Sequence, residues 1–234
     1  MGIHVPEEAK KKLANVRFVF EKTWDAYNKE FGTEEDFAVQ LEQFARELPA
    51  NSRVLDLGCG NGYNAGKLKK LGLIPIGIDS NPDMIATAKK EHPDIEFRQM
   101  DMLDIGEEFE DESFDGVIAF YSLYFLPRSV FNSFVDVLSS KIKQGGSLLI
   151  INQLGNGEGY VDESLLEAAN ENGKNALFTN LYLEQDLIEI FKSRGFVAEN
   201  IYKLDNENAD EIDGDGRIAI RFKKKQMEYP HPSR

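Results

Sequence analysis

The feature that most constrains this chain is a short apolar segment that runs directly into a glycine-rich loop. Val54-Leu55-Asp56-Leu57 predicts a buried strand, and Gly58-Cys59-Gly60-Asn61-Gly62 follows it at once. Glycines at a strand-to-helix turn let the backbone approach a ligand where a Cβ atom would block it. They also leave helix amides facing the crevice at the carboxyl ends of parallel strands. We therefore expect an α/β protein with a ligand site at this turn, the alternative being a plain tight turn.

Apolar strands and amphipathic helices alternate through the rest of the chain. We expect strands at 54–57, 73–78, 95–97, 114–120, 147–151, 196–204 and 218–222. Continuous apolar strands separated by helices are typical of a parallel sheet covered on both faces. The last two strands are joined by a loop with little helical content, which favours antiparallel pairing. The prediction is a Rossmann-like, doubly wound, seven-stranded, mostly parallel sheet with a last antiparallel strand and helices on both faces.

The length of 234 residues allows one to two domains. We expect a single domain over 1–234, divided into an N-terminal helical cap (1–48), a ligand-binding half (49–152), an insertion or lid (153–182) and the C-terminal part of the sheet (183–225). The cap contains a helix from Glu7 to Phe31 and a second one that starts near a capping box at 33–36. We expect a turn at Gly145-Gly146, and a loop with a short helix at 164–169 in the insertion.

Composition excludes several functional classes. With 27 basic and 41 acidic residues, the net charge is -14, which disfavours nucleic acid and anionic membranes as partners. Cys59 is the single cysteine, so no internal disulfide and no multi-cysteine metal site is expected. There is no long apolar run and no signal-peptide pattern, so we expect a cytoplasmic protein. We expect it to be a monomer or a homodimer. The acidic stretch at 205–215 only loosely resembles a calcium loop, because Phe222 stands where the loop needs a glutamate, and no metal site is predicted.

Three carboxylates follow successive strands. Asp56 lies at the end of the first strand, Asp79 at the end of the second and Asp101 just after the third. A dinucleotide-binding fingerprint would need a glycine at position 63, where this chain has Tyr63. The acid at position 56 would also repel a pyrophosphate. Asp79 can accept from ribose hydroxyls, and Asp101 from an exocyclic amine. The three together suit a nucleoside that carries a positively charged amino-acid tail.

Five motifs carry a resemblance to a known family. They are found at 54–62, at 77–84, at 101–102, at 114–120 and at 145–150. In this combination the sequence resembles class I S-adenosylmethionine-dependent methyltransferases. The match extends over roughly 50–152, and 183–222 fits the expected end of that fold.

The resemblance implies S-adenosylmethionine as cofactor and S-adenosylhomocysteine as product. It implies that the glycine loop lines the methionine part with Asp56 near its amino group, that Asp79 holds the ribose, and that Asp101 and the Met102 backbone hold adenine. Met84 would pack on adenine, within the core, or both. The Phe120 carbonyl would face the sulfonium, and Tyr27 would form an aromatic lid. The implied cofactor residues are Asp56, Gly58, Cys59, Gly60, Asn61, Gly62, Asp79, Ser80, Met84, Asp101, Met102, Phe120 and Tyr27.

The sequence defines the binding site of the methyl acceptor less well than that of the cofactor. Tyr121 and Tyr124 follow the fourth strand, where they either line an acceptor pocket, the interpretation we favour, or pack on the next helix. Phe125 stands where many relatives have a histidine, so no histidine base is expected there. Cys59 has no histidine near it in the sequence and is interpreted as a packed residue rather than a nucleophile.

The expected function is methyl transfer to an oxygen or nitrogen atom of a small molecule. The alternatives are an RNA or protein methyltransferase and a non-catalytic S-adenosylmethionine-binding protein, with a nicotinamide dehydrogenase as a weaker rival.

Overall fold

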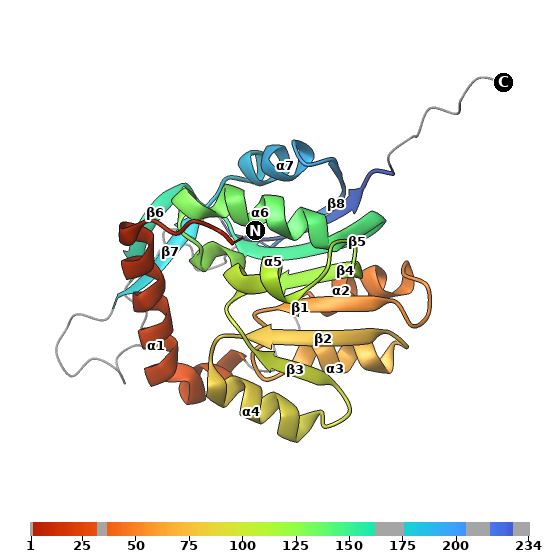
Figure 1. Cartoon of the computed structure of the whole chain (residues 1–234), viewed down its shortest axis with the longest axis horizontal. Helices are drawn as coiled ribbons and strands as arrows, with labels where there is room; N and C mark the ends of the chain where they lie inside the picture. The colour runs from red at the N-terminus through yellow and green to blue at the C-terminus, as the bar shows by residue number, and fades with distance from the viewer. Residues whose placement is uncertain (1, 32–36, 162–175, 205–215, 227–234) are drawn as a thin grey trace.

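The architecture is a seven-stranded sheet with helices on both faces (Figure 1). The computed structural model describes residues 2–31, 37–161, 176–204 and 216–226. The strand order is β3-β2-β1-β4-β5-β9-β8; β1 to β5 run parallel, and β9 is antiparallel to both β5 and β8. This confirms the predicted fold class. The strands are β1 (Arg53–Leu57), β2 (Ile74–Asp79), β3 (Glu96–Gln99), β4 (Phe114–Phe120), β5 (Ile142–Gln153), β8 (Phe196–Leu204) and β9 (Arg217–Lys224).

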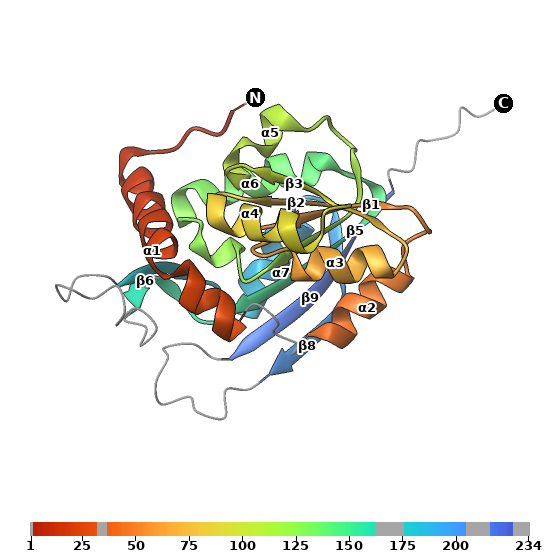
Figure 2. The same cartoon turned by 90° about the horizontal axis from the view of Figure 1, so that it is seen from below.

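Two apolar cores lie on opposite faces of the sheet. One packs the strands against α5 (Ile105–Glu108), α6 (Arg128–Lys141) and α7 (Glu184–Lys192), with Phe131 and Phe191 fully buried. The other packs them against α2 (Ala38–Arg46) and α3 (Tyr63–Lys70) through Phe44 and Leu68. Figure 2 shows α2 and α3 away from α5 and α6. The central strands β1, β4 and β5 are covered on both sides, so most of their residues are apolar without alternation, whereas buried and exposed residues alternate in the edge strand β8.

The helix α4 (Pro82–Glu91) starts where the sequence predicts. The side chain of Asn81 accepts hydrogen bonds from the backbone N–H groups of Asp83 (2.8 Å) and Met84 (3.2 Å), and Pro82 occupies the first turn, where its missing N–H has no cost. The turn between β2 and α4 is therefore fixed by local sequence. It holds Asp79 and Ser80 at the carboxyl end of the sheet.

Two sequence expectations differ from the structure. Gly145 and Gly146 do not form a separate turn, because β5 begins at Ile142 and runs through them with an irregular register against β4. Gly145 has a φ of 74°, a backbone angle that glycine adopts without strain. The insertion is not only loop: β6 (Gly157–Val161) pairs antiparallel with β7 (Leu177–Leu181). The segments 33–36, 164–169 and 205–215 lie outside the described residues.

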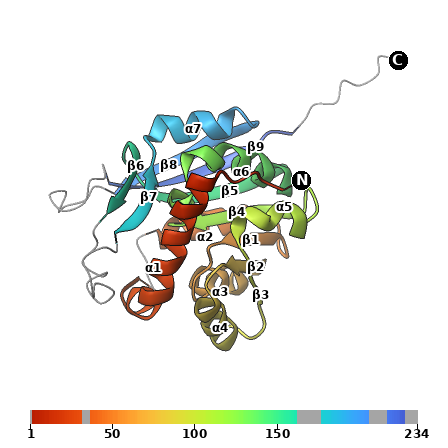
Figure 3. The ribbon, with the colours of Figure 1, turned by 60° about the vertical axis from the view of Figure 1, so that its left-hand side comes forward.

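The long helix α1 (Glu7–Phe31) lies across the carboxyl edge of the parallel strands (Figures 1 and 3). Asn15 fastens it to β7, since its Oδ1 accepts from the Phe178 N–H (2.8 Å) and its Nδ2 donates to the Ala176 carbonyl (3.1 Å). Lys12 forms an ion pair with Glu158 of β6 at 2.7 Å. The two-stranded β6–β7 ribbon therefore holds α1 in place over the strand ends. Over the described parts of the chain, no helix is both long and apolar enough to cross a membrane.

Candidate functional site

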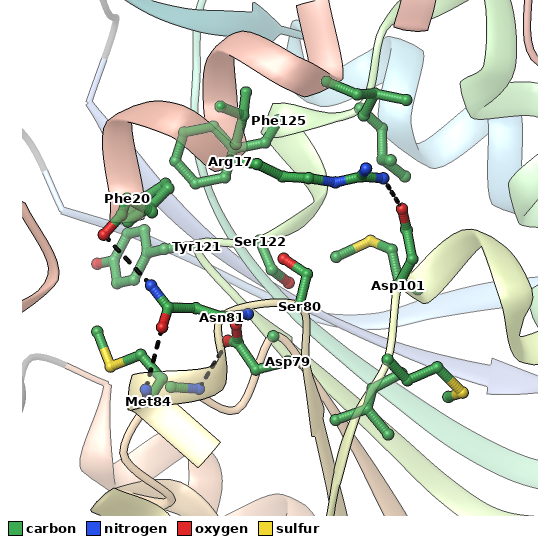
Figure 4. A pocket seen from close by; sticks show the side chains of 18 of the residues that line it. Arg17, Phe20, Asp79, Ser80, Asn81, Met84, Asp101, Tyr121, Ser122 and Phe125 are labelled. Carbon is green, nitrogen blue, oxygen red and sulfur yellow. Dashed lines mark hydrogen bonds and ion pairs between the residues drawn. The ribbon is translucent and has the colours of Figure 1, made fainter. Parts of the chain in front are cut away.

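A pocket of about 170 Å³ lies between α1 and the carboxyl ends of β1, β2 and β4 (Figure 4). Its floor comes from the glycine loop and the turn after β2, and its roof from α1. The residues that line it are Leu13, Val16, Arg17, Phe20, Glu21, Tyr27, Gly58, Gly60, Ile78, Asp79, Ser80, Asn81, Met84, Met100, Asp101, Met102, Phe120, Tyr121, Ser122, Phe125 and Leu126. The parallel topology brings these distant segments together, because parallel strands end at the same edge.

The glycine loop packs directly on the end of β4. Gly58 has a φ of 72°, and a Cβ atom built on it would lie 2.6 Å from the Cβ of Ser122. The Ser122 hydroxyl donates a hydrogen bond to the Leu57 carbonyl at 2.7 Å. Both the backbone angle and the close approach of Ser122 therefore require glycine at position 58.

Asp79 organises the turn beneath the pocket. Its Oδ2 accepts from the Gly60 N–H at 3.0 Å, and its Oδ1 accepts from the Asn81 N–H at 2.8 Å. Burial raises the pKa of this carboxyl, while the amides of Asn81, Gly60 and Ser80 act in the opposite direction. The carboxylate lines the pocket, and its oxygens can still accept further hydrogen bonds. A ligand with two hydroxyl groups requires such an acceptor.

Asp56 lies beneath the glycine loop and does not line the pocket. It is 1% exposed, and its Oδ2 has no hydrogen-bond partner in the described part of the protein. Burial raises the pKa of Asp56 to about 7; the charge of Asp79 adds to the effect, and a hydrogen bond with the Ala65 backbone opposes it. An unpartnered buried carboxyl of this kind is costly unless a donor or a cation comes close to it. This fits a ligand with an ammonium group held over the loop.

Asp101 lies at the other end of the pocket. Its Oδ1 accepts from the Leu103 N–H at 2.9 Å, and its Oδ2 forms an ion pair with Arg17 of α1. The thioether side chains of Met84, Met100 and Met102 also line the pocket. Such polarizable groups suit the faces of an aromatic ring, with the carboxylate as acceptor for an exocyclic amine at its edge.

The remaining wall is aromatic. Phe20 meets Tyr27 and Phe125 edge-on, with ring centroids 5.3 and 5.1 Å away. Tyr121 lines the pocket with a backbone φ of 52°, an uncommon angle for a bulky residue, and its N–H donates to the Ile151 carbonyl at 2.8 Å. Tyr124 is buried against Phe125, with ring centroids 4.3 Å apart. Of the two tyrosines, only Tyr121 therefore faces the ligand space.

The structure brings most of the sequence-predicted residues together. The first pocket is lined by Tyr27, Gly58, Gly60, Asp79, Ser80, Met84, Asp101, Met102, Phe120 and Tyr121. Cys59 and Asn61 line an adjoining cavity of about 100 Å³, which Tyr27 also lines. Three predicted residues line neither of these cavities: Asp56, Gly62 and Tyr124.

The thiol of Cys59 is buried, and burial raises its pKa well above the usual value, with the charges of Asp56 and Asp79 adding to the effect. A protonated, buried thiol fits a packing role. Among the described side chains, no group of three or more His, Cys, Asp or Glu residues is placed to hold a metal ion.

Sequence reasoning missed several lining residues: Arg17, Phe20, Asn81, Ser122 and Phe125. Arg17 and Phe20 could have been found from helical spacing, because they share a face of α1 with Leu13 and Tyr27. Asn81 and Ser122 directly follow the predicted residues Ser80 and Tyr121, and that position was the signal that could have found them. Phe125 packs against Phe20 of α1, a contact for which local sequence has no signal.

Comparison with known proteins agrees with this geometry. Residues 54–146 match the family model described as "Methyltransferase domain". The chain is 29% identical over 117 residues to a ubiquinone biosynthesis O-methyltransferase of Xanthomonas axonopodis pv. citri, covering 48% of this chain and 48% of the relative. It is 32% identical over 115 residues to the ribosomal protein L11 methyltransferase of Burkholderia lata, covering 47% of this chain and 35% of the relative. The chain thus spans about half the length of these curated relatives, or less.

A solved structure resembles nearly the whole chain. The 1,6-didemethyltoxoflavin-N1-methyltransferase of Burkholderia thailandensis, with bound 1,6-didemethyltoxoflavin and S-adenosylhomocysteine, superposes with a TM-score of 0.73 at 13% identity, covering 96% of this chain and 94% of that one. At this identity the likeness concerns the fold. The fold, the glycine loop and the family match together define a class I S-adenosylmethionine-dependent methyltransferase domain, the class whose methyl donor is S-adenosylmethionine.

Proposed function

We propose that this chain is an enzyme that transfers a methyl group from S-adenosylmethionine to an oxygen or nitrogen atom of a small molecule. The observation that carries the proposal is the pocket beneath α1, where Asp79 and Asp101 stand on one side and an aromatic wall on the other. The carboxylates suit the adenosine part of the cofactor, and the aromatic wall suits an acceptor of small size.

The cofactor would supply an electrophilic methyl group on a sulfonium, which an acceptor atom attacks in line with the breaking carbon–sulfur bond. The protein's part in such a reaction is to position the reactants and exclude water. Asp79 would accept from the ribose hydroxyls, and Asp101 from the adenine amine. The buried charge of Asp56 would be balanced by the ammonium of the methionine tail. Tyr27 would cover the cofactor, and the Phe120 carbonyl would face the sulfonium.

Tyr121 is the residue that we assign to the acceptor. It lines both cavities next to the glycine loop, and its strained backbone angle fixes where its side chain enters them. Backbone strain of this kind is concentrated at functional sites, because it persists only where the surroundings enforce it. The phenol would orient the acceptor, whose proton would leave to Tyr121, to a carboxylate or to water.

The roof favours a small acceptor over a polymer. Phe20, from α1, packs edge-on against Phe125 in the pocket lining. The helix α1 is fastened to β6 and β7 on one side and to Asn81 on the other. An RNA or a folded protein would have to displace this helix to reach the floor. Protein methylation is the second candidate, because a ribosomal protein methyltransferase is among the relatives.

Incubation with radiolabelled S-adenosylmethionine separates the candidates. The enzyme would be given, in parallel, a metabolite extract, total RNA and a ribosomal protein fraction, with heat-inactivated enzyme as control. Label in the small-molecule fraction supports the proposal. Label in RNA or protein would contradict it, and S-adenosylhomocysteine binding without transfer to any fraction would favour a non-catalytic binding protein.

A further inference from the structure

The ion pair between Arg17 and Asp101 lies where two cavities meet. On one side is the pocket described above, and on the other a wider groove of about 830 Å³ between the N-terminal segment, α1 and the end of β3. The two cavities share six lining residues: Leu13, Arg17, Glu21, Ser80, Met100 and Asp101. The pair therefore stands at the junction between the cofactor pocket and the open groove.

The Arg17 side chain crosses the pocket itself. Figure 4 shows it running from beside Phe125 to Asp101, over the space between the roof and the turn after β2. Within the described lining, Arg17 is the only cation. Half of its side chain is exposed, against 22% for Asp101, so the guanidinium can leave toward solvent more easily than the carboxylate can.

This position conflicts with the role assigned to Asp101. One of its oxygens already accepts from the Leu103 N–H, and the other is paired with Arg17. Each carboxylate oxygen can accept a second hydrogen bond, but the guanidinium lies across the pocket against Asp101, where an adenine amine would have to approach the carboxylate. Unlike Asp101, which the Leu103 amide holds, Arg17 is attached only through its own flexible stem.

We propose that Arg17 is a gate residue, which closes the pocket by pairing with Asp101 and swings into the groove when the adenosyl group of the cofactor takes its place. This inference rests on the proposed function. Glu21 offers the second position: it lies one turn further along α1, lines both cavities, and forms no ion pair with any described residue. Residues four apart on a helix are neighbours, so Arg17 reaches Glu21 without movement of the backbone.

The helix itself stays in place as the gate opens. Asn15 and Lys12 hold α1 to the β6–β7 ribbon, and Asn81 holds the carbonyl of Phe20 at 3.2 Å. These contacts lie on either side of Arg17 along the helix and do not involve it. Opening therefore replaces the partly exposed ion pair with Asp101 by one with Glu21, and the difference in free energy between the two is small.

Isothermal titration with S-adenosylhomocysteine tests the gate on the full chain. In Arg17→Met the unbranched stem is kept and the competing charge is lost, so we expect affinity about two- to fivefold higher than in the wild type. Arg17→Lys keeps a competing cation and should stay near the wild type. Added salt should tighten binding more for the wild type than for Arg17→Met, because it screens the closed pair.

The outcomes are distinct. Weaker binding in Arg17→Met would show that Arg17 holds the cofactor and would overturn the gate. Equal affinity and equal salt dependence in the two proteins would also overturn it, because the pair would then remain closed. If the wild type binds neither S-adenosylmethionine nor S-adenosylhomocysteine, the proposed function itself fails.

Discussion

The side chain of Asn81 joins the floor of the pocket to its roof: its Nδ2 donates a hydrogen bond to the carbonyl of Phe20 on α1, at 3.2 Å. The same side chain caps α4 through its Oδ1, which accepts from Asp83 and Met84. One amide group thus performs two tasks, and substitution can separate them.

Asn81→Asp keeps the cap acceptor and removes the donor to α1, whereas Asn81→Ala removes both. We expect Asn81→Asp to increase amide hydrogen exchange in α1 with little change in α4. Asn81→Ala should increase exchange in both helices and lower the free energy of unfolding by about 1 kcal/mol through the lost cap. Hydrogen exchange read by mass spectrometry checks this. Unchanged α1 protection in Asn81→Asp would show that the amide does not hold the roof.

Asp79→Ala should weaken S-adenosylhomocysteine binding at least several-fold. The carboxylate is the expected ribose partner, and it also accepts from the Gly60 and Asn81 amides that shape the turn. Titration calorimetry measures the affinity, with circular dichroism to show that the variant is folded. Asp94→Ala, at a carboxylate that is 68% exposed and outside the pocket lining, is the control and should bind normally. Unchanged affinity in Asp79→Ala would mean that the motif assignment is misplaced.

Substitution of Tyr121 should separate stability from activity. Asparagine tolerates the left-handed backbone angle better than tyrosine, so Tyr121→Asn should recover up to about 1 kcal/mol of strain. We expect its melting temperature to match or exceed that of the wild type, while kcat/KM for the acceptor falls at least tenfold. Tyr121→Phe keeps the ring and tests the hydroxyl alone. A large loss of melting temperature in Tyr121→Asn would indicate a packing role instead.

Asp56 should make stability depend on pH. Because its pKa is about 7 when folded and near 4 when unfolded, the folded protein keeps a proton that the unfolded chain has released. Its contribution to the free energy of unfolding therefore falls as pH rises from about 4 to about 7, and then stays constant. In calorimetric scans, we expect the melting temperature of Asp56→Asn to exceed that of the wild type by a margin that grows between pH 5 and pH 7.5. A constant difference across that range would show that Asp56 is already charged.

Gly58→Ala should destabilise the protein strongly. The added Cβ would meet Ser122 at 2.6 Å in a backbone conformation that disfavours alanine. Overpacking and strain together predict a loss of about 2–4 kcal/mol in urea unfolding. Gly159→Ala is the matched control, because a Cβ atom added there would have no atom of the described residues within 4 Å and its φ lies outside the left-handed range. Its stability should stay close to that of the wild type. Similar losses of stability in both variants would mean that the contact with Ser122 does not cause the destabilisation of Gly58→Ala.

Local sequence was enough to predict most of the sheet and its helices. Strand β4 and helix α4 have the expected bounds, because a run of apolar residues and an asparagine–proline start are signals within one element. The β6–β7 ribbon was missed. The β6 sequence Gly157-Glu-Gly-Tyr-Val161 has little apolar pattern, and its partner β7 begins only at Leu177, so no short hairpin turn signals the pairing.

The candidate site likewise has features that local sequence predicts and features that it does not. Local sequence predicts the glycine loop and the acids that end the first strands, because a strand end, a turn and a helix cap are each encoded within a few residues. Only the tertiary structure placed Asp56 beneath the loop, turned Tyr124 into the core and laid Arg17 over the pocket onto Asp101. The contact between Arg17 and Asp101 depends on the path of α1 across the sheet. That path is set by contacts such as those of Asn15 with β7, between residues more than 160 positions apart.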